Sequence, residues 1–138
     1  TPCFVFDEVQ LEARMRAVRE SVPKAVSLCY SIKANPFLIS AMRGLVGTLE
    51  VCSPGELEIC RQMGVPADMV LFSGVNKTKA DVERAMDLGV THFTCESPLH
   101  IRLIDELAAA FDPGLSRSAP ADGRFAIRHG RAGFLRRA

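Results

Sequence analysis

One lysine stands at the end of an uncharged run of the chain, where it could do chemistry. Residues 25–32 are all apolar or small, Lys33 follows directly, and the pair Asn35-Pro36 comes two residues later. Such a run suits a buried strand of a parallel sheet, covered on both faces. Because a proline disfavours helical geometry in the residue before it, the chain should turn at Asn35. We therefore expect Lys33 at the carboxyl end of a strand, where ligands and catalytic groups of parallel α/β proteins collect.

The ε-amino group of Lys33 has two interpretations. An amine partly withdrawn from water loses its proton more readily and becomes a nucleophile that can form a Schiff base with a carbonyl compound. Lysine is seldom buried, however, and a lysine near a strand end is most often simply solvated. The run and the turn leave both interpretations open.

Three blocks of sequence resemble one enzyme family. Residues 30–36, Tyr-Ser-Ile-Lys-Ala-Asn-Pro, are similar to the strand that carries the cofactor lysine in the fold-type III, or alanine-racemase-like, pyridoxal-phosphate (PLP) enzymes. The likeness is greatest to the diaminopimelate and ornithine decarboxylase group. Residues 49–57 resemble that group's second barrel strand and the start of the next helix, and residues 71–78 resemble its third strand and loop. The resemblance runs from Thr1 to about Phe111 and then fades.

The pattern of elements predicts an α/β fold. After a helix at 8–22, the chain alternates between short β-favouring runs and helical patterns, with Pro54 and Pro98 in the first turns of two helices. The expected strands are 25–32, 48–52, 69–72 and 92–95, and the helices that follow them are 37–46, 54–63, 79–88 and 98–111. Such short, regular units favour a (β/α)8 TIM barrel over an open sheet, and the resemblance implies the same fold.

The chain is short for that fold. A complete barrel needs eight units and roughly 250 residues, whereas this chain has 138. We expect a partial PLP-binding barrel over residues 1–111, followed over 112–138 by an irregular loop, a candidate fifth strand and a divergent basic tail. The chain would be an N-terminal fragment, a truncated gene product or the product of a changed reading frame near residue 112.

The resemblance implies where the cofactor would bind. Lys33 would be the catalytic residue that holds PLP as a Schiff base. Glu50 matches an acidic residue that lies close to the cofactor in the ornithine-type enzymes, although a carboxylate at this place could instead cap the helix that begins near Pro54. Ser53 is a second cofactor-binding candidate, and it is also a typical helix N-cap.

Two further cofactor-binding candidates come from later blocks. Ser73 ends the third predicted strand, close to Asn76. Arg128 resembles the arginine that ends the fifth strand of the family, but His129 and Gly130 depart from the family's pattern.

The implied reaction is PLP-dependent decarboxylation of an amino acid, with the cofactor as electron sink. Diaminopimelate, ornithine or a related diamino acid would be the substrate, and the full-length relatives would be homodimers. The family's phosphate loop and its partner for the pyridine nitrogen belong to later parts of the fold, so we expect the 138-residue chain to be inactive alone. A PLP carrier or homeostasis protein of the same barrel family, or a non-catalytic remnant, are the alternatives.

Composition predicts an ordinary globular protein. Lys and Arg number 17 against 16 Asp and Glu, a formal net charge of +1, which gives no argument for binding nucleic acid or a membrane. No apolar run approaches the roughly 20 residues that cross a bilayer, and the first residues do not resemble a signal peptide, so we expect a cytoplasmic protein. The five cysteines include no Cys-x-x-Cys pair and are expected to be buried small hydrophobes. Three scattered histidines predict no metal site.

Overall fold

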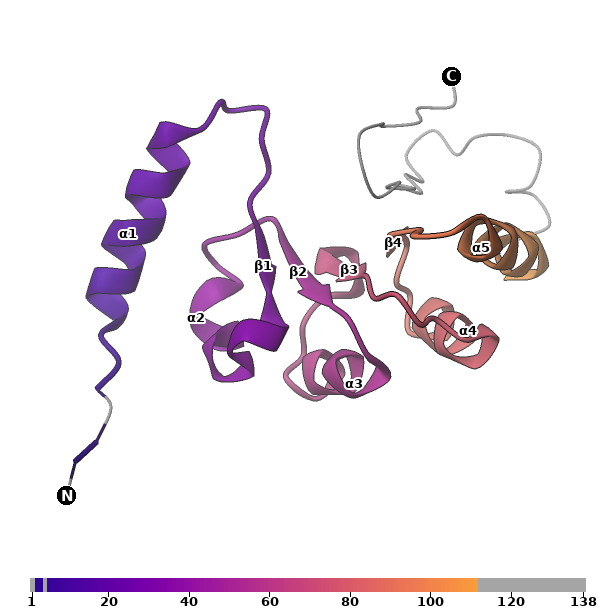
Figure 1. Ribbon diagram of the computed structural model, residues 1–138. Coiled ribbons are helices and arrows are strands. Elements are labelled where there is room, and N and C mark those ends of the chain that lie inside the picture. Colours follow the sequence, from indigo (N-terminus) through magenta and orange to yellow (C-terminus); the bar gives the residue numbers. More distant parts are fainter. Residues whose placement is uncertain (1, 4, 112–138) are drawn as a thin grey trace.

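The computed structural model describes residues 2–3 and 5–111. Its centre is a four-stranded parallel sheet whose strands lie side by side in chain order (Figure 1). The strands are β1 (Cys29–Ser31), β2 (Thr48–Val51), β3 (Val70–Phe72) and β4 (His92–Phe93). Because each connection moves the chain one place along the sheet, this is the α/β order of consecutive units in a (β/α) barrel.

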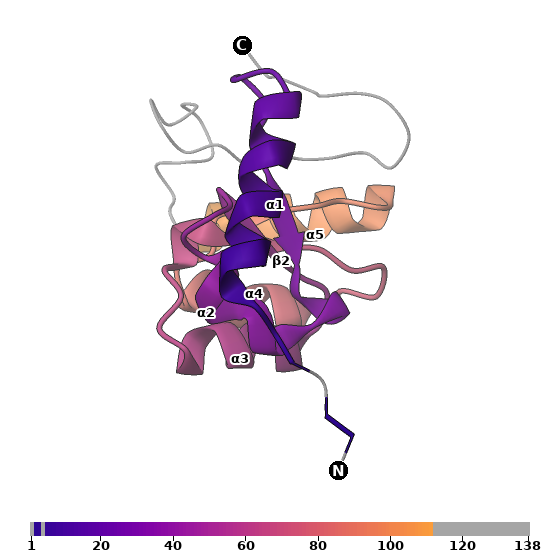
Figure 2. The same ribbon diagram turned by 90° about the vertical axis from the view of Figure 1, so that its left-hand side faces the viewer.

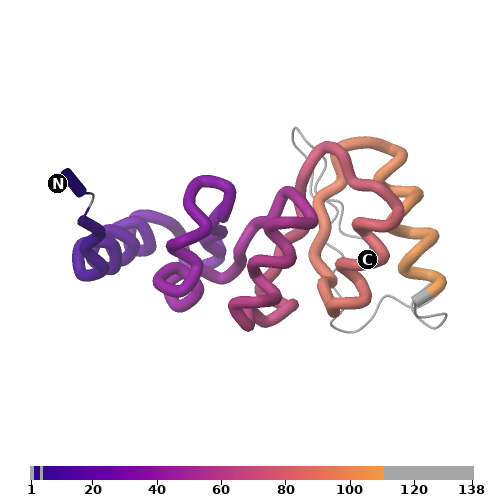
Figure 3. The backbone as a smooth tube through the Cα atoms, turned by 90° about the horizontal axis from the view of Figure 1, so that it is seen from below, coloured from indigo at the N-terminus to yellow at the C-terminus, as the bar shows by residue number. Residues whose placement is uncertain are grey.

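Helices alternate with the strands. The α-helices are α1 (Glu8–Ser21), α2 (Ile39–Met42), α3 (Pro54–Gln62), α4 (Lys79–Asp87) and α5 (Pro98–Phe111). Short 3-10 turns are η1 (Ile32–Ala34), η2 (Pro36–Leu38) and η3 (Ala67–Met69). Figure 3 shows the units following one another along the chain, from the indigo amino-terminal helix to the orange α5. In the described part of the chain, no helix is long and apolar enough to cross a membrane.

The hydrophobic core lies on one face of the sheet. Leu49, Val51, Val70, Phe72 and Phe93 are buried at alternate positions of the strands. The rings of Phe72 and Phe93 meet edge to face, with centroids 6.0 Å apart. α-Helical residues of the same cluster are Ile39, Leu57, Cys60, Val82, Ala85, Ile104 and Leu107.

The opposite face of the sheet is open. Ser31, Glu50, Leu71 and His92 lie opposite one another in register across the four strands, and none of them is buried. Cys29, on the edge strand β1, is exposed. The prediction of a first strand covered on both faces is therefore wrong, because none of the residues of β1 is buried and no second layer of the described chain covers this face. In a closed barrel this face would point inward.

The first unit also differs from the prediction in length. Only Cys29–Ser31 of the expected strand 25–32 pairs with β2, and the expected helix 37–46 is reduced to η2 and the four residues of α2. The side chain of Asn35 accepts a hydrogen bond from the amide of Phe37 at 3.1 Å, which starts a tight 3-10 turn rather than a full helix. The other three units lie close to their predicted positions.

Helix α1 stands at the β1 end of the sheet (Figures 1 and 2). It begins at an N-cap, Asp7, whose side chain accepts a hydrogen bond from the amide of Gln10. None of its residues is buried, although Leu11, Met15 and Val18 form a half-buried stripe at helical spacing. The helix is thus amphipathic but only partly packed.

The cysteines only partly follow the prediction. Cys60 and Cys95 are buried, and Cys52 is half-buried. Cys3 and Cys29 are exposed, because one precedes α1 and the other lies on the edge strand. The prediction of buried small hydrophobes is wrong for these two.

A carboxylate joins α3 to α4. Glu58 accepts hydrogen bonds from Arg61 at 2.6 Å, Gln62 at 2.9 Å and Arg84 at 2.8 Å. These bonds, that of Arg61 first, lower the pKa of Glu58 from 4.5 to about 2. A depressed carboxyl pKa adds stability above the unfolded-state value, and this stability is lost as the pH falls through the folded-state value.

We therefore expect the wild type to have a higher free energy of unfolding than Glu58→Gln at neutral pH, and this difference to shrink as the pH falls from 4.5 to about 2. Urea unfolding of both proteins at several pH values measures it. The effect should be small because Glu58 lies at the surface. A difference in unfolding free energy that stays constant across this range would contradict the role of the Glu58 network.

Candidate functional site

The candidate site lies where the four parallel strands end. Lys33 lies in η1, directly after β1, as predicted, and its side chain is exposed. Glu50 lies near the end of β2 and is paired in register with Ser31 of β1. Ser31 precedes Lys33 by two residues. Ser73 and Thr94 directly follow β3 and β4. The structure thus brings Lys33, Glu50 and Ser73 to one edge of the sheet, which we call the rim.

The turn that carries Lys33 is fixed on both sides. Ile32 is fully buried, and η1 packs against β2. The Tyr30 hydroxyl donates a hydrogen bond to the carbonyl of Asn35 at 2.9 Å. A lysine between a buried anchor and a closed turn has a defined backbone position, while its amine remains accessible.

Glu50 is free for a role other than capping. The carboxylate bound to the backbone just before α3 is that of Glu56, which accepts a hydrogen bond from the amide of Cys52 at 2.7 Å, while the N-cap of α3 is Ser53. Beside Glu50 in the register, the hydroxyl oxygen of Ser31 is buried and has no hydrogen-bond partner among the described residues. A carboxylate and an unsatisfied hydroxyl on the open face are groups that a polar ligand could bind.

Ser53 has a structural role. Its hydroxyl accepts a hydrogen bond from the amide of Glu56 at 3.2 Å and so caps α3. Glu56 in turn accepts a hydrogen bond from the amide of Cys52, the residue before this N-cap. If Ser53 also bound the cofactor, its hydroxyl oxygen would have to serve both the cofactor and the amide of Glu56.

Ser73 is buried and tied to both neighbouring strands. Its amide donates a hydrogen bond to the carbonyl of Val51 at 2.7 Å, and its hydroxyl accepts one from the Thr94 hydroxyl at 3.1 Å. Gly74 follows with a φ of 106°, and a Cβ there would lie 2.5 Å from the carbonyl oxygen of Cys52. The ends of β2 and β3 can approach this closely because residue 74 is glycine.

Cys52 lies among the charged groups of the rim. Burial raises the pKa of its thiol first, the negative charge of Glu50 raises it further, and the positive charge of Lys33 acts in the opposite direction. The thiol is therefore protonated at neutral pH and is a poor nucleophile. The same interactions indicate that Lys33 and Glu50 both lie within electrostatic range of Cys52.

Sequence reasoning missed a second lysine at the rim. Lys77 is only 7% exposed, and its ammonium group donates a hydrogen bond to the carbonyl of Gly74. It also lies 6.0 Å from the centroid of the Phe72 ring. Burial lowers the pKa of Lys77, while the negative charge of Glu96 opposes this shift. The available signal was its place in the block 71–78, in the loop that follows a predicted strand.

Several predicted features lie outside the described residues. These are Arg128, the candidate fifth strand and the tail over 112–138. Among the residues that are described, no group of three or more His, Cys, Asp or Glu could hold a metal ion.

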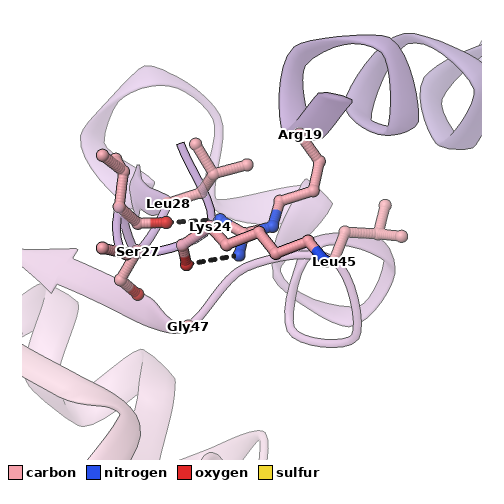
Figure 4. A pocket seen from close by; sticks show the side chains of 8 residues that line it. Arg19, Lys24, Ser27, Leu28, Leu45 and Gly47 are labelled. Atoms are coloured by element: carbon pink, nitrogen blue, oxygen red, sulfur yellow. Dashed lines mark hydrogen bonds between the residues drawn. The ribbon is translucent and has the colours of Figure 1, made fainter. Parts of the chain in front are cut away.

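A hollow of about 350 Å³ lies at the opposite ends of the strands, between α1 and the segment before β1. Figure 4 shows Arg19 reaching from α1 to the backbone on this side. Its guanidinium donates hydrogen bonds to the carbonyls of Lys24, at 3.1 Å, and Val26. Because these donors already hold α1 to the connection that leads to β1, we assign the hollow a structural role.

Solved structures share this arrangement. Diaminopimelate decarboxylase from Helicobacter pylori, in complex with L-lysine, superposes with a TM-score of 0.64 at 23% identity, over 80% of this chain and 29% of that one. Ornithine decarboxylase from Entamoeba histolytica gives a TM-score of 0.66 at 21% identity, over 75% and 32% of the two chains. At these identities the likeness establishes the fold, the first part of a TIM barrel.

Curated relatives agree with the structural neighbours. Diaminopimelate decarboxylase from Actinosynnema pretiosum subsp. auranticum is 39% identical over 124 residues, which are 87% of this chain and 28% of that protein. The enzyme of the same name from Aquifex aeolicus is 30% identical over 110 residues, 78% of this chain and 26% of that protein. The chain thus spans little more than a quarter of the relatives that it matches.

The family match covers most of the chain. Residues 8–122 match the family described as pyridoxal-dependent decarboxylase, pyridoxal binding domain. PLP is therefore the cofactor that the family implies. This match and the placement of Lys33 at the rim of a parallel barrel sheet agree with each other, and the chain belongs to the family of PLP-dependent decarboxylases of fold type III.

Proposed function

We propose that this chain is the PLP-binding part of a decarboxylase that acts on diaminopimelate, ornithine or a related diamino acid. The observation that carries the proposal is the position of Lys33, on a fixed turn at the carboxyl edge of the sheet, beside Glu50. Curated relatives named diaminopimelate decarboxylase support this substrate class.

Lys33 is the residue that would bind the cofactor. Its amine nitrogen would bond to the aldehyde carbon of PLP, and the aldehyde oxygen would leave as water. When bound, PLP supplies an electron sink for the bond to the departing carboxylate. The protein's own contribution at this rim is to hold the amine on a rigid turn, beside groups that orient the cofactor ring.

The polar groups around Lys33 fit part of such a ligand. Glu50 would face the cofactor ring, and the unsatisfied hydroxyl of Ser31 could donate a hydrogen bond to one of its oxygens. Ser73 would line the pocket while bonded to Thr94. Ser53 would act mainly by holding the start of α3, and Arg128 remains a prediction from the sequence.

Activity would require more of the fold than the 138 residues supply. The sheet has an open inner face that a closed barrel would cover, and the relatives are about three times as long as this chain. We propose that the complete protein, in its homodimeric and cytoplasmic form, decarboxylates its substrate, and that this chain alone does not.

Absorbance titration with PLP, together with measurement of CO2 release from diaminopimelate and ornithine, tests the proposal. The expected result is a new absorbance band of a PLP–lysine adduct without appreciable CO2 release. Absence of any adduct at millimolar PLP would contradict cofactor binding by this chain. Turnover by the 138-residue chain would contradict its proposed inactivity.

A further inference from the structure

Lys77 differs from the other lysines of the chain. The four lysines are Lys24, Lys33, Lys77 and Lys79, and only Lys77 is buried. Burying an ammonium group is unfavourable unless other groups compensate it. Among the described residues, this ammonium group contacts the carbonyl of Gly74 and the Phe72 ring, so the compensation has to come largely from charges farther away.

Those charges lie on the strands to either side. Glu96, after β4, has the strongest favourable effect on the Lys77 ammonium, and Glu50 on β2 adds a weaker one. Neither carboxylate forms an ion pair with Lys77 within 4.0 Å among the described residues. The ammonium group therefore lies near both carboxylates but is not closed off by either of them.

Other titratable groups near Lys77 are two cysteines and a histidine, which carry no charge at neutral pH. Cys52 and Cys95 also lie within electrostatic range of Lys77. On α5, the pKa of the buried His100 is lowered by burial first and then by the positive charge of Lys77. His100 Nδ1 accepts a hydrogen bond from the amide of Glu96 at 3.4 Å, as a neutral imidazole does. Lys77 is thus a buried cation among mostly neutral or acidic groups.

We propose that Lys77 supplies the positive charge that attracts the anionic, phosphate-bearing cofactor to this rim and offsets the carboxylates of Glu96 and Glu50. This inference rests on the proposed function of Lys33. Without Lys77, Lys33 would be the one cation among the side chains of the described part whose charges act on Cys52 and Lys77, against Glu50, Glu56 and Glu96. A phosphate ester would then meet a markedly more negative site.

A purely structural role for Lys77 makes different predictions. If Lys77 only held the Gly74 carbonyl, Lys77→Met would weaken cofactor binding, whereas Glu96→Gln, which leaves this hydrogen bond intact, would not strengthen it. If Lys77 acts through its charge, the two changes have opposite signs, because one removes a cation and the other removes an anion.

The first measurement follows Lys77 in the full 138-residue chain without cofactor. With lysine labelled by carbon-13 at Cε, NMR titration should show Lys77 losing its proton below the usual lysine range, because burial disfavours its charge. Glu96→Gln should lower the pKa of Lys77 further, and Glu50→Gln should lower it by less. Glu83→Gln, which removes the ion-pair partner of Lys79, should leave Lys77 unchanged. A pKa of Lys77 that is the same in Glu96→Gln, Glu50→Gln and the wild type would overturn the inference.

The second measurement is the yield of PLP trapped on Lys33 by borohydride at limiting PLP. We expect Lys77→Met to lower the yield roughly fivefold, as the loss of one partly screened charge would. Lys77→Arg should restore most of it, and Glu96→Gln should raise it above the wild type. Lys79→Met, a change at an exposed lysine close by, should have little effect.

These outcomes separate the inference from the proposed function. If the wild type traps PLP on Lys33 and Lys77→Met does so equally well, the role of Lys77 is refuted while the function of Lys33 stands. If no variant traps PLP on Lys33, the proposed function fails, and the proposal for Lys77 fails with it even where the NMR coupling is present. Thermal unfolding of each variant shows that it is folded. Glu96→Gln keeps the test decisive should Lys77→Met not fold, because only the charge role predicts a raised yield.

Discussion

Lys33→Ala is expected to abolish the absorbance band that PLP produces with the wild-type chain. The amine of Lys33 is the only atom of the rim that we propose to bond to the cofactor, and alanine leaves no nucleophile in its place. Because Lys33 is exposed and packs no core group, the variant should unfold at nearly the wild-type temperature. The spectral change would therefore report the lost amine rather than a lost fold.

Lys24→Ala is the matched control for this experiment. Lys24 is also an exposed lysine of the first unit, but it lines the hollow at the opposite ends of the strands. The variant Lys24→Ala should therefore leave the absorbance band of the PLP adduct intact. Equal loss of the band in both variants would indicate nonspecific reaction of surface amines and would contradict a dedicated site at Lys33.

Phe72→Ala should lower the free energy of unfolding by about 3–5 kcal/mol, the usual range for deleting a buried aromatic ring. Phe72 is 1% exposed at the end of β3, and its ring packs edge to face on Phe93. Its deletion leaves a cavity beneath the rim, where the Lys77 ammonium lies over the ring. Urea unfolding measures the change.

Phe37→Ala provides the comparison for Phe72. Phe37 is 91% exposed, so its replacement should change the unfolding free energy by no more than about 0.5 kcal/mol. Similar losses in the two variants would mean that the sheet is not packed as described.

The later units of the fold could be predicted from the sequence because local signals coincide with tertiary packing there. Pro54 and Pro98 are the first residues of α3 and α5, as their fixed φ angle favours. Ser53 caps α3 as a serine at that place typically does. Apolar residues at strand spacing then identify the buried face of β2 and β3.

The first unit could not be predicted as well, for a physical reason. An uncharged run does not show whether a second layer will cover it, and β1 has a neighbouring strand on one side only. The run at 25–32 is therefore mostly an exposed connection, of which only Cys29–Ser31 pairs with the sheet. The turn at Asn35 was predictable, and it is this turn that places Lys33.

The candidate site was predictable where a residue's place follows from the strand order. Lys33, Glu50 and Ser73 come together because parallel strands end at one edge. The burial of Lys77 was not predictable in this way, since it depends on a loop side chain that folds back over the sheet edge. The spacing of apolar residues in the sequence does not indicate the direction that a loop side chain takes.

Binding of the cofactor by Lys33 can be measured by locating the bound PLP on the chain. The chain is incubated with limiting PLP, reduced with borohydride, digested and analysed by mass spectrometry. We expect the reduced PLP group on the peptide that contains Lys33, in clear excess over Lys24 and Lys79. Label spread evenly over the exposed lysines, or absent from Lys33, would contradict it.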